Sequence, residues 1–170
     1  AGGAKVCDKI QILKQFVETG VQSIFIGGKM ANSFLMAQQQ KDMLKPFSIE
    51  TIPDKLLTPY KNENQEILND VLLAEKIIDL AEEKKVYILL PDDYKVVTEF
   101  KSISFENKQS PDFTKELQLD LGEKTIYQFA ENLKGIENVF WNGPLGAYDH
   151  TLCSSYAEGS LEIAKLLFRK

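Results

Sequence analysis

The sequence predicts a three-layer α/β/α fold built around a mainly parallel β-sheet. Short apolar runs, typical of strands buried on both faces, alternate with segments in which apolar residues recur at helical spacing. Helices of roughly 10 to 15 residues between strands favour right-handed βαβ units, whose strands run parallel. Unusual residues, many of them glycines, follow several of the apolar runs. Ligands of such folds bind beyond the carboxyl ends of the strands, so a functional site is expected there.

Composition limits the possible classes of protein. With 170 residues, 44% hydrophobic and 26% charged, the chain fits one globular domain or a piece of one. A net charge of −5 makes nucleic acid an unexpected partner, because no basic excess is present to neutralise phosphates. Two cysteines are too few for a disulfide framework, which favours a cytoplasmic location. No run approaches the roughly 18 apolar residues of a membrane span, so no membrane association is expected.

The first half of the chain predicts a helix, a strand and a second helix. Val6–Glu18 has helical spacing and ends before Gly20, a residue typical of positions just after a helix. The run SIFIGG, Ser23–Gly28, predicts a buried strand, and a helix is expected from Met30 onward. The polar segment Lys41–Glu66 contains three prolines and predicts a long irregular connection.

The second half continues the alternation. Helical spacing returns around Val71–Ala81, and the run VYILLP, Val86–Pro91, predicts a second buried strand. Short alternating pieces within Glu99–Leu119 predict a small hairpin. The remaining expected elements are a helix around Ile126–Leu133, a strand in NVFWNG (Asn138–Gly143) and a helix around Ala157–Phe168. We expect the three strands to be parallel, with their carboxyl ends at one edge of the sheet.

The opening segment GGAK has the character of a phosphate site. Glycines that lead into a helix let backbone N–H groups approach an anion, and the helix N-terminus adds a partial positive charge. Lys5 and Lys9 are four residues apart, which on a helix places both on one face, within reach of a polyphosphate. The same spacing fits a solvated helix face, so it leaves both interpretations open.

Several other polar or aromatic residues lie in the expected loops. Asp92, Asp93 and Asp120 could bind a sugar or lie near a metal ion, although acidic loop residues are more often solvated or cap a helix. His150 is the only histidine, so no histidine-centred metal cluster or catalytic triad is expected, and no metal site is predicted. Trp141, the only tryptophan, is more typical of a core residue than of a stacking platform.

Several motifs follow one another along the chain in this order: GGAKVCDKI, IGGKMANSFL, ILLPDD, LDLGEKT with FAENLK, and FWNGPLGAYD. Together they resemble the C-terminal, nucleotide-binding domain of phosphoglycerate kinase. The resemblance covers nearly the whole chain, and the combination of GGAKV…DKI with WNGP-x-G is highly specific. It implies that residues 1–170 are part of that domain, with a Rossmann-like sheet of the phosphoglycerate kinase C-terminal type.

The resemblance implies a nucleotide site at the strand ends. Lys5 and Lys9 would face the phosphates and the transferring phosphoryl group as catalytic residues. Asp149, where the family usually has a glutamate, would meet the ribose, and Lys29 replaces a third glycine or other small residue beside the adenine. The remaining nucleotide-binding residues implied are Gly3, Ala4, Gly27, Gly28, Gly122, Asn142, Gly143 and Pro144.

The implied reaction is reversible phosphoryl transfer between 1,3-bisphosphoglycerate and ADP, giving 3-phosphoglycerate and ATP, with Mg²⁺ accompanying the nucleotide. 3-Phosphoglycerate would be held by an N-terminal domain that is absent from the chain. The chain also ends before the family's GGG-D-[ST] phosphate loop. We therefore expect the isolated chain to be inactive, because in-line transfer requires both substrates to be held together.

We also consider two other classes of protein. The first is a non-catalytic module that uses the same fold to bind adenine nucleotides or a protein partner. A substrate domain upstream and a GGG-D-[ST] loop downstream in the full-length gene would distinguish the enzyme from such a module. The second is the dinucleotide-binding domain of a dehydrogenase, which is disfavoured because no G-x-G-x-x-G motif follows a strand.

Overall fold

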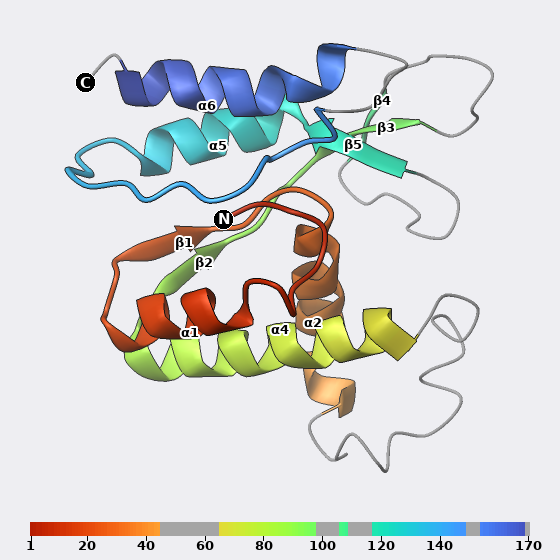
Figure 1. Ribbon diagram of the computed structural model, residues 1–170, viewed down its shortest axis with the longest axis vertical. Helices are drawn as coiled ribbons and strands as arrows, with labels where there is room; N and C mark the ends of the chain where they lie inside the picture. Colours follow the sequence, from red (N-terminus) through yellow and green to blue (C-terminus); the bar gives the residue numbers. More distant parts are fainter. Residues whose placement is uncertain (45–64, 98–105, 109–116, 149–153, 169–170) are drawn as a thin grey trace. The chain divides into compact units, whose positions relative to one another are not determined.

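The computed structural model describes residues 1–44, 65–97, 106–108, 117–148 and 154–168 (Figure 1). The chain divides into two compact units. The first unit comprises Ala1–Ala4, Phe25–Ala31 and Leu89–Lys170, and the second unit comprises Lys5–Ile24 and Asn32–Ile88. Each unit contains its own buried apolar residues.

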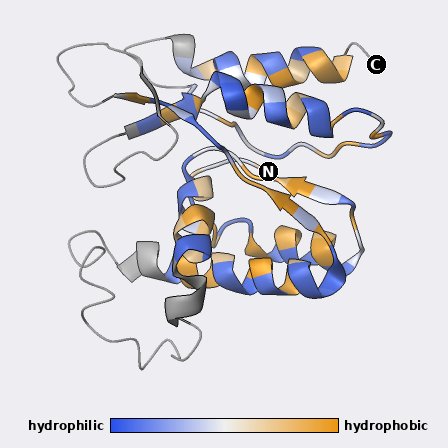
Figure 2. Cartoon of the chain, turned by 180° about the vertical axis from the view of Figure 1, so that it is seen from behind, coloured by the Kyte–Doolittle hydropathy of each residue, from blue (hydrophilic) through white to orange (hydrophobic). Residues whose placement is uncertain are grey.

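The second unit is mainly helical. Its α1 (Ile10–Glu18) lies against α4 (Gln65–Lys84), and most of α2 (Met30–Leu44) belongs to the same unit (Figure 1). Figure 2 shows apolar and polar residues alternating around these helices, the pattern expected when one side of a helix is buried. The buried apolar residues of the three helices within this unit include Leu13, Val17, Phe34, Ala37, Val71, Ala74, Ile77, Ile78 and Ala81.

The helix α1 begins later than its apolar spacing predicts. The prediction started it at Val6, but residues 6–9 form a bend and turns, and the helix begins at Ile10. The carboxylate of Asp70, on α4, accepts hydrogen bonds from the N–H groups of Val6 at 2.8 Å and Cys7 at 2.9 Å. The start was predicted too early because the apolar period extends through a turn whose N–H groups bond to a distant side chain rather than within a helix.

The strands β1 (Ser23–Phe25) and β2 (Tyr87–Leu89) pair with each other. Two backbone bonds lie at the ends of the pair: Tyr87 N–H to Gln22 O at 3.2 Å and Ile26 N–H to Leu89 O at 3.0 Å. The paired positions advance together along both strands, so the strands are parallel, as predicted. However, Tyr87 is 72% exposed, so β2 is less buried than its apolar sequence predicted.

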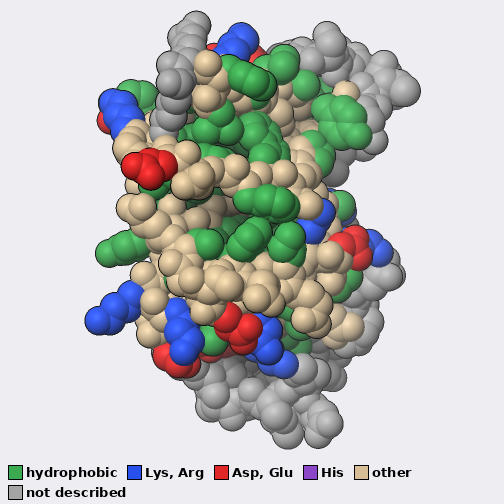
Figure 3. Space-filling model, turned by 60° about the vertical axis from the view of Figure 1, so that its left-hand side comes forward, with side chains coloured by type: hydrophobic (Ala, Val, Ile, Leu, Met, Phe, Trp, Pro, Cys, Tyr) green, Lys and Arg blue, Asp and Glu red, His purple; other side chains and the backbone are tan. Residues whose placement is uncertain are grey.

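The third predicted strand, in NVFWNG, is absent, and that prediction is wrong. Residues 136–142 have no regular secondary structure. Val139, Phe140 and Trp141 are 45%, 61% and 36% exposed. The prediction inferred burial from an apolar run, but these side chains reach the surface. Hydrophobic side chains are also visible at the surface on the face drawn in Figure 3.

The first unit contains an antiparallel sheet in which β3 (Tyr94–Val97) is central. The strand β4 (Glu106–Lys108) pairs with one side of β3, and β5 (Leu117–Leu121) pairs with the other. The sequence predicted a hairpin within Glu99–Leu119. Residues 99–105 and 109–116 of that segment lie outside the described residues, and the described strands β4 and β5 each pair with β3. The strand β3 was missed because its four residues are too short a run for alternation to stand out.

Two helices complete the first unit. The helices α5 (Glu123–Asn132) and α6 (Glu158–Phe168) lie side by side (Figure 1), and the short 3-10 helix η1 (Ser154–Ala157) precedes α6. The ring of Phe25 packs edge-to-face on Phe129, with ring centroids 5.0 Å apart. The buried core around Phe129 consists of Leu121, Phe129, Leu133, Leu145 and Ile163.

The parallel strand pair and the alternation of helices and strands are those of an α/β fold, as the sequence predicted. The three-layer arrangement stays a prediction. The middle of the predicted irregular connection, residues 45–64, lies outside the described residues, and its two ends are the helices α2 and α4. Within the described part of the chain, no helix combines the length and the apolar character needed to cross a membrane.

Replacing Phe129 with alanine should lower the free energy of unfolding by about 3–5 kcal/mol, because a buried aromatic ring leaves the core. The matched control is Tyr127→Ala on the same helix. The Tyr127 side chain is 68% exposed, and its loss should cost less than about 0.5 kcal/mol. Urea unfolding followed by circular dichroism measures both variants. Equal losses in the two variants would contradict the assignment of this core.

Candidate functional site

Three backbone segments of the first unit, residues 1–3, 27–30 and 142–145, meet at a contact that we call the glycine crossing. Four backbone hydrogen bonds join them: Gly2 N–H to Asn142 O (2.8 Å), Gly27 N–H to Ala1 O (2.9 Å), Gly28 N–H to Leu145 O (3.1 Å) and Met30 N–H to Gly3 O (3.0 Å). The predicted site motifs GGAK, SIFIGG and WNGP-x-G each contribute one segment. The structure therefore brings together segments that are far apart in the sequence.

The glycines of the crossing occupy positions where the backbones leave no room for a side chain. A Cβ atom on Gly2 would lie 2.0 Å from the carbonyl oxygen of Pro144. A Cβ on Gly28 would lie 2.8 Å from the carbonyl oxygen of Gly3, and one on Gly143 would lie 2.3 Å from that of Gly2. Gly28 and Gly143 also have φ angles of +69° and +86°, which favour glycine. Close backbone contact thus explains the glycines at these positions.

The hydrogen bonds of the crossing change the expected role of its N–H groups. The sequence predicts that glycine N–H groups of the GGAK type approach a phosphate. In the structure, however, the N–H groups of Gly2, Gly27 and Gly28 donate to backbone carbonyl oxygens. These three N–H groups are therefore bonded within the protein rather than to a ligand.

Gly27 lies against side chains of the apolar core, whereas Gly122 lies against Asp93. A Cβ atom on Gly27 would lie 2.7 Å from Cδ2 of Leu145 and 3.6 Å from Cδ2 of Leu121. Gly122 follows Leu121 directly and is the N-cap residue of α5. The predicted nucleotide-binding residues that the first unit contains are Gly3, Ala4, Gly27, Gly28, Gly122, Asn142, Gly143 and Pro144.

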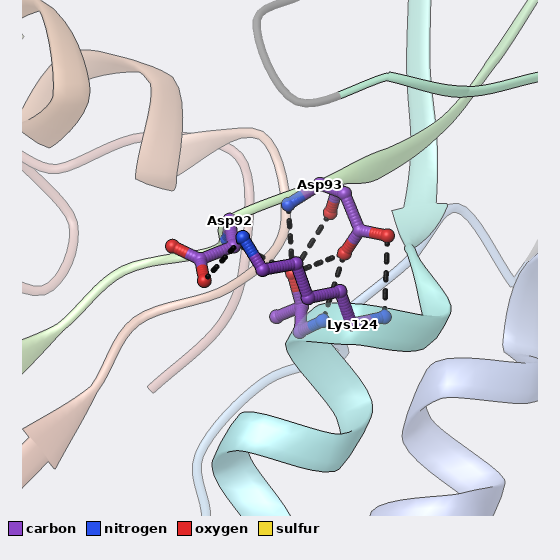
Figure 4. A network of polar contacts seen from close by, with 4 residues as sticks. Asp92, Asp93 and Lys124 are labelled. Carbon is purple, nitrogen blue, oxygen red and sulfur yellow. Dashed lines mark hydrogen bonds and ion pairs between the residues drawn. The ribbon is translucent and has the colours of Figure 1, made fainter.

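Asp92 and Asp93 hold the start of α5, as Figure 4 shows. Oδ1 of Asp93 accepts hydrogen bonds from the N–H of Thr125 at 2.8 Å and from its hydroxyl at 2.7 Å, and Oδ2 accepts the N–H of Lys124 at 3.2 Å. The ammonium group of Lys124 lies 3.3 Å from the Asp92 carboxylate. Asp93 therefore caps the N-terminus of α5. Helix capping is one of the roles that the sequence analysis left open for this residue.

Asp120 is also buried, with 2% of its surface exposed. Its Oδ1 accepts the N–H of Leu121 and its Oδ2 accepts the N–H of Gly159, both at 2.8 Å. Burial raises the pKa of this carboxyl to about 6, while the two N–H groups and the charge of Lys95 act to lower it. The carboxylate thus bonds to backbone groups within the protein, where the sequence had suggested contact with a sugar or a metal ion.

Lys5 and Lys9 belong to the second unit. Lys9 is the residue immediately before α1, and Lys5 lies outside the helix, so the two do not share a helical face as their spacing predicted. The N–H groups bound by Asp70 belong to Val6 and Cys7, between the two lysines. Asp70 is 7% exposed, and it was missed because nothing near it in the sequence shows its partners.

The sequence also drew attention to Lys29, Trp141, Asp149 and His150. Lys29 is exposed and directly precedes α2. Trp141 was expected in the core, but it is 36% exposed, and its indole N–H donates to the carbonyl oxygen of Gly143 at 2.7 Å. Asp149 and His150 lie outside the described residues. Among the residues that the structure does describe, no group of three or more His, Cys, Asp or Glu side chains is placed to hold a metal ion.

Comparison with known sequences identifies the family of this chain. The model of a family described as "Phosphoglycerate kinase" matches residues 1–170. The phosphoglycerate kinase of Clostridium perfringens (strain SM101 / Type A) is 32% identical over 167 residues, covering 98% of this chain and 36% of that protein. "Phosphoglycerate kinase, cytosolic" of Trypanosoma congolense is 31% identical over 170 residues, covering 98% of this chain and 34% of that protein. The chain thus spans about a third of the length of these relatives.

A solved structure supports the fold. The phosphoglycerate kinase from Coxiella burnetii matches with a TM-score of 0.71 and 24% sequence identity, covering 99% of this chain and 38% of that one. At this identity the likeness shows the fold alone, and it agrees with the α/β class predicted from the sequence.

The glycine crossing predicts different costs for two glycine substitutions. Both Gly28 and Gly135 have positive φ, but a Cβ on Gly135 would meet no atom within 4 Å. Gly135→Ala should therefore cost only about 1 kcal/mol of strain, whereas Gly28→Ala adds a clash with Gly3 and should cost at least about 2 kcal/mol more. Urea unfolding of both variants measures the difference. Equal costs would mean that the close contact at Gly28 is absent in solution.

The buried carboxyl of Asp120 predicts a pH dependence of stability. Its folded pKa of about 6 lies above the value of about 3.9 for an unfolded aspartate. Between these values the folded state binds more protons at this group, so the contribution of Asp120 to the free energy of unfolding should fall as pH rises from about 4 to 6. Asp120→Asn should remove this contribution. Urea unfolding across that range tests it, and identical slopes in both proteins would contradict the assignment.

Proposed function

The chain belongs to the phosphoglycerate kinase family, and we propose that it forms part of the nucleotide site of such an enzyme. The proposed reaction is reversible phosphoryl transfer from 1,3-bisphosphoglycerate to ADP, giving 3-phosphoglycerate and ATP. The observation that carries the proposal is the glycine crossing, which joins the GGAK, SIFIGG and WNGP-x-G segments. These are the motifs through which the chain resembles the family.

We propose that the backbone of the crossing provides the nucleotide-binding surface. Gly27 and Gly28 would flank the adenine, as the resemblance to the family implies. The segment Asn142–Pro144 would lie under the ribose and phosphates, and Gly122 would line the same site. Asp149 is proposed to meet the ribose hydroxyls.

Lys5 and Lys9 are proposed to carry the positive charge that the reaction needs. Phosphoryl transfer spreads negative charge over the equatorial oxygens, and catalysis consists mainly of holding the reactants in line and stabilising that charge. The N–H groups of Gly2, Gly27 and Gly28 are bonded within the protein. A larger share of the phosphate charge would therefore be met by lysine ammonium groups, and Asp70 would support them by fixing the backbone between the two lysines.

Mg²⁺ and 3-phosphoglycerate would be held by groups other than the glycine crossing. We propose that Mg²⁺ enters bound to the nucleotide phosphates as part of the substrate. 3-Phosphoglycerate would be bound by a second domain outside the 170 residues. A cytosolic location is proposed as well, because the Trypanosoma congolense relative is named "Phosphoglycerate kinase, cytosolic".

Titration calorimetry with ADP tests the proposed function. A full-length protein that contains this chain should bind ADP with micromolar affinity, whereas the isolated chain should bind in the millimolar range, about −4 kcal/mol. Absence of ADP binding to the full-length protein would refute the proposed nucleotide site. Equal micromolar affinity in both would refute the expected need for a phosphate loop outside the chain.

The isolated chain should also show no kinase turnover, because it cannot bring both substrates together. A coupled assay that follows ATP consumption with 3-phosphoglycerate measures this. The full-length protein provides the positive control. Turnover by the isolated chain well above a buffer blank would contradict the assignment of the second substrate to another domain.

Substitution of the two lysines tests their assigned role. In the full-length protein, Lys5→Ala and Lys9→Ala should each lower kcat by about 100-fold or more, because a charge that acts in the transition state is lost. Adenosine affinity should stay unchanged. The control is Lys14→Ala, whose exposed ammonium group lies 3.6 Å from Glu18 on α1. Steady-state kinetics measure the effect, and an unchanged kcat in either lysine variant would exclude that residue from catalysis.

A further inference from the structure

We propose that Asp120 is a positioning residue for the WNGP turn, residues 141–147, and thereby for the bound nucleotide. The inference rests on the proposed function, and it assigns a role to a side chain of the LDLGEKT motif that is not among the proposed nucleotide-binding residues. Asp120 does not contact the nucleotide in this proposal. It acts through the backbone of the turn, to which its carboxylate is directly packed.

The first link is the contact between the carboxylate and Gly146. A Cβ atom at Gly146 would lie 2.4 Å from Oδ1 of Asp120 and 2.2 Å from the carbonyl oxygen of Tyr156. A Cβ at Gly159 would likewise lie 2.6 Å from Oδ1 of Asp120. The carboxylate is therefore enclosed by two glycine backbones, one in the turn and one at the start of α6. No larger side chain fits at either place without a shift of the backbone.

The second link is a set of hydrogen bonds that attach the turn to the same two elements. The N–H of Ala147 donates to the carbonyl oxygen of Leu119 on β5 at 2.7 Å. The N–H of Leu145 donates to the hydroxyl of Ser160 on α6 at 3.0 Å. Asp120 itself lies on β5 and accepts the N–H of Gly159 on α6. The carboxylate thus holds together the two elements to which the turn is bonded.

The third link connects the turn to the glycine crossing. The carbonyl oxygen of Leu145 accepts the N–H of Gly28 at 3.1 Å, and the carbonyl oxygen of Asn142 accepts the N–H of Gly2 at 2.8 Å. A displacement of the turn would therefore also shift the segments proposed to flank the adenine. Misplacement of a reactant by about 1 Å can cost about 100-fold in rate.

The charge of Asp120 suits this role better than a neutral group of the same shape. Lys95 is its partner across the β3–β5 pair, and Lys95 in turn contacts Glu158 at the start of α6. Each carboxylate oxygen of Asp120 accepts one backbone N–H. An asparagine amide has only one acceptor oxygen, so its NH₂ group would face one of these N–H donors. Asp120→Asn should accordingly weaken the contact between β5, α6 and the WNGP turn, with little change in side-chain volume.

The experiment measures steady-state kinetics of Asp120→Asn in the full-length protein. We expect the KM for ADP to rise about tenfold, equivalent to about 1.4 kcal/mol, while the KM for 1,3-bisphosphoglycerate changes less than about twofold. The control is Ile77→Ala in α4, which removes a buried side chain of the second unit. It should lower Tm without changing the KM for ADP.

Ser160→Ala provides a second, milder variant that loses only the hydroxyl bound to Leu145, and it carries the test if Asp120→Asn does not fold. It should raise the KM for ADP in the same direction by a smaller factor. An unchanged KM for ADP in the folded variants would overturn the proposal, as would equal changes in both KM values. If the unsubstituted full-length protein does not bind ADP, the proposed function itself fails, and this result is distinct from an unchanged variant.

Discussion

Close contact between backbones at the glycine crossing is the constraint on which the candidate site depends. A hydrogen bond between an N–H and a carbonyl group requires the two backbones to approach within about 3 Å of each other. Such an approach at Gly2, Gly28 and Gly143 is possible only without a Cβ atom. The relative positions of three loops are thereby determined by backbone groups, whose geometry varies much less than that of long side chains. The hydrogen bonds that hold these three segments together thus come from the protein itself.

Buried aspartates supply a second kind of connection between distant parts of the chain. Asp70 bonds to Val6, 64 residues away, Asp93 to Thr125, 32 residues away, and Asp120 to Gly159, 39 residues away. In each case a carboxylate accepts N–H groups at or near the start of a helix. Such N–H groups have no partner within their own helix, and a buried carboxylate without partners would be costly. Each pairing satisfies both requirements at once.

The helices and the parallel strand pair could be predicted because their signals are local. Apolar spacing identified α1, α4, α5 and α6, and the apolar runs before Gly27 and Pro91 identified β1 and β2. The strand predicted in NVFWNG failed because an apolar run resembles a buried strand even where its side chains are exposed. The late start of α1 and the roles of Asp70 and Asp120 could not be predicted. Their partners lie tens of residues away, and sequence spacing carries no information on contacts of that kind.

The glycine motifs show how one prediction can identify a place and yet misjudge its chemistry. Their convergence at one site was expected, and the structure brings the GGAK, SIFIGG and WNGP-x-G segments together. A donor role toward phosphate was expected for the N–H groups of the GGAK segment, but the N–H of Gly2 donates to the carbonyl oxygen of Asn142. A glycine in a loop indicates that something approaches closely. Whether a ligand or another part of the backbone does so is decided by the tertiary structure.

Trp141 provides an intrinsic fluorescence signal from the WNGP turn. It is the only tryptophan among the 170 residues, so selectively excited indole fluorescence arises from a single place in the chain. Its ring is 36% exposed, and its N–H is bonded to Gly143 within the WNGP turn. Indole emission responds to the polarity and hydrogen bonding of the ring's surroundings. Movements of this turn can therefore be followed by emission wavelength and quenching in the unlabelled protein, without attaching a dye near the glycines that tolerate no added atoms.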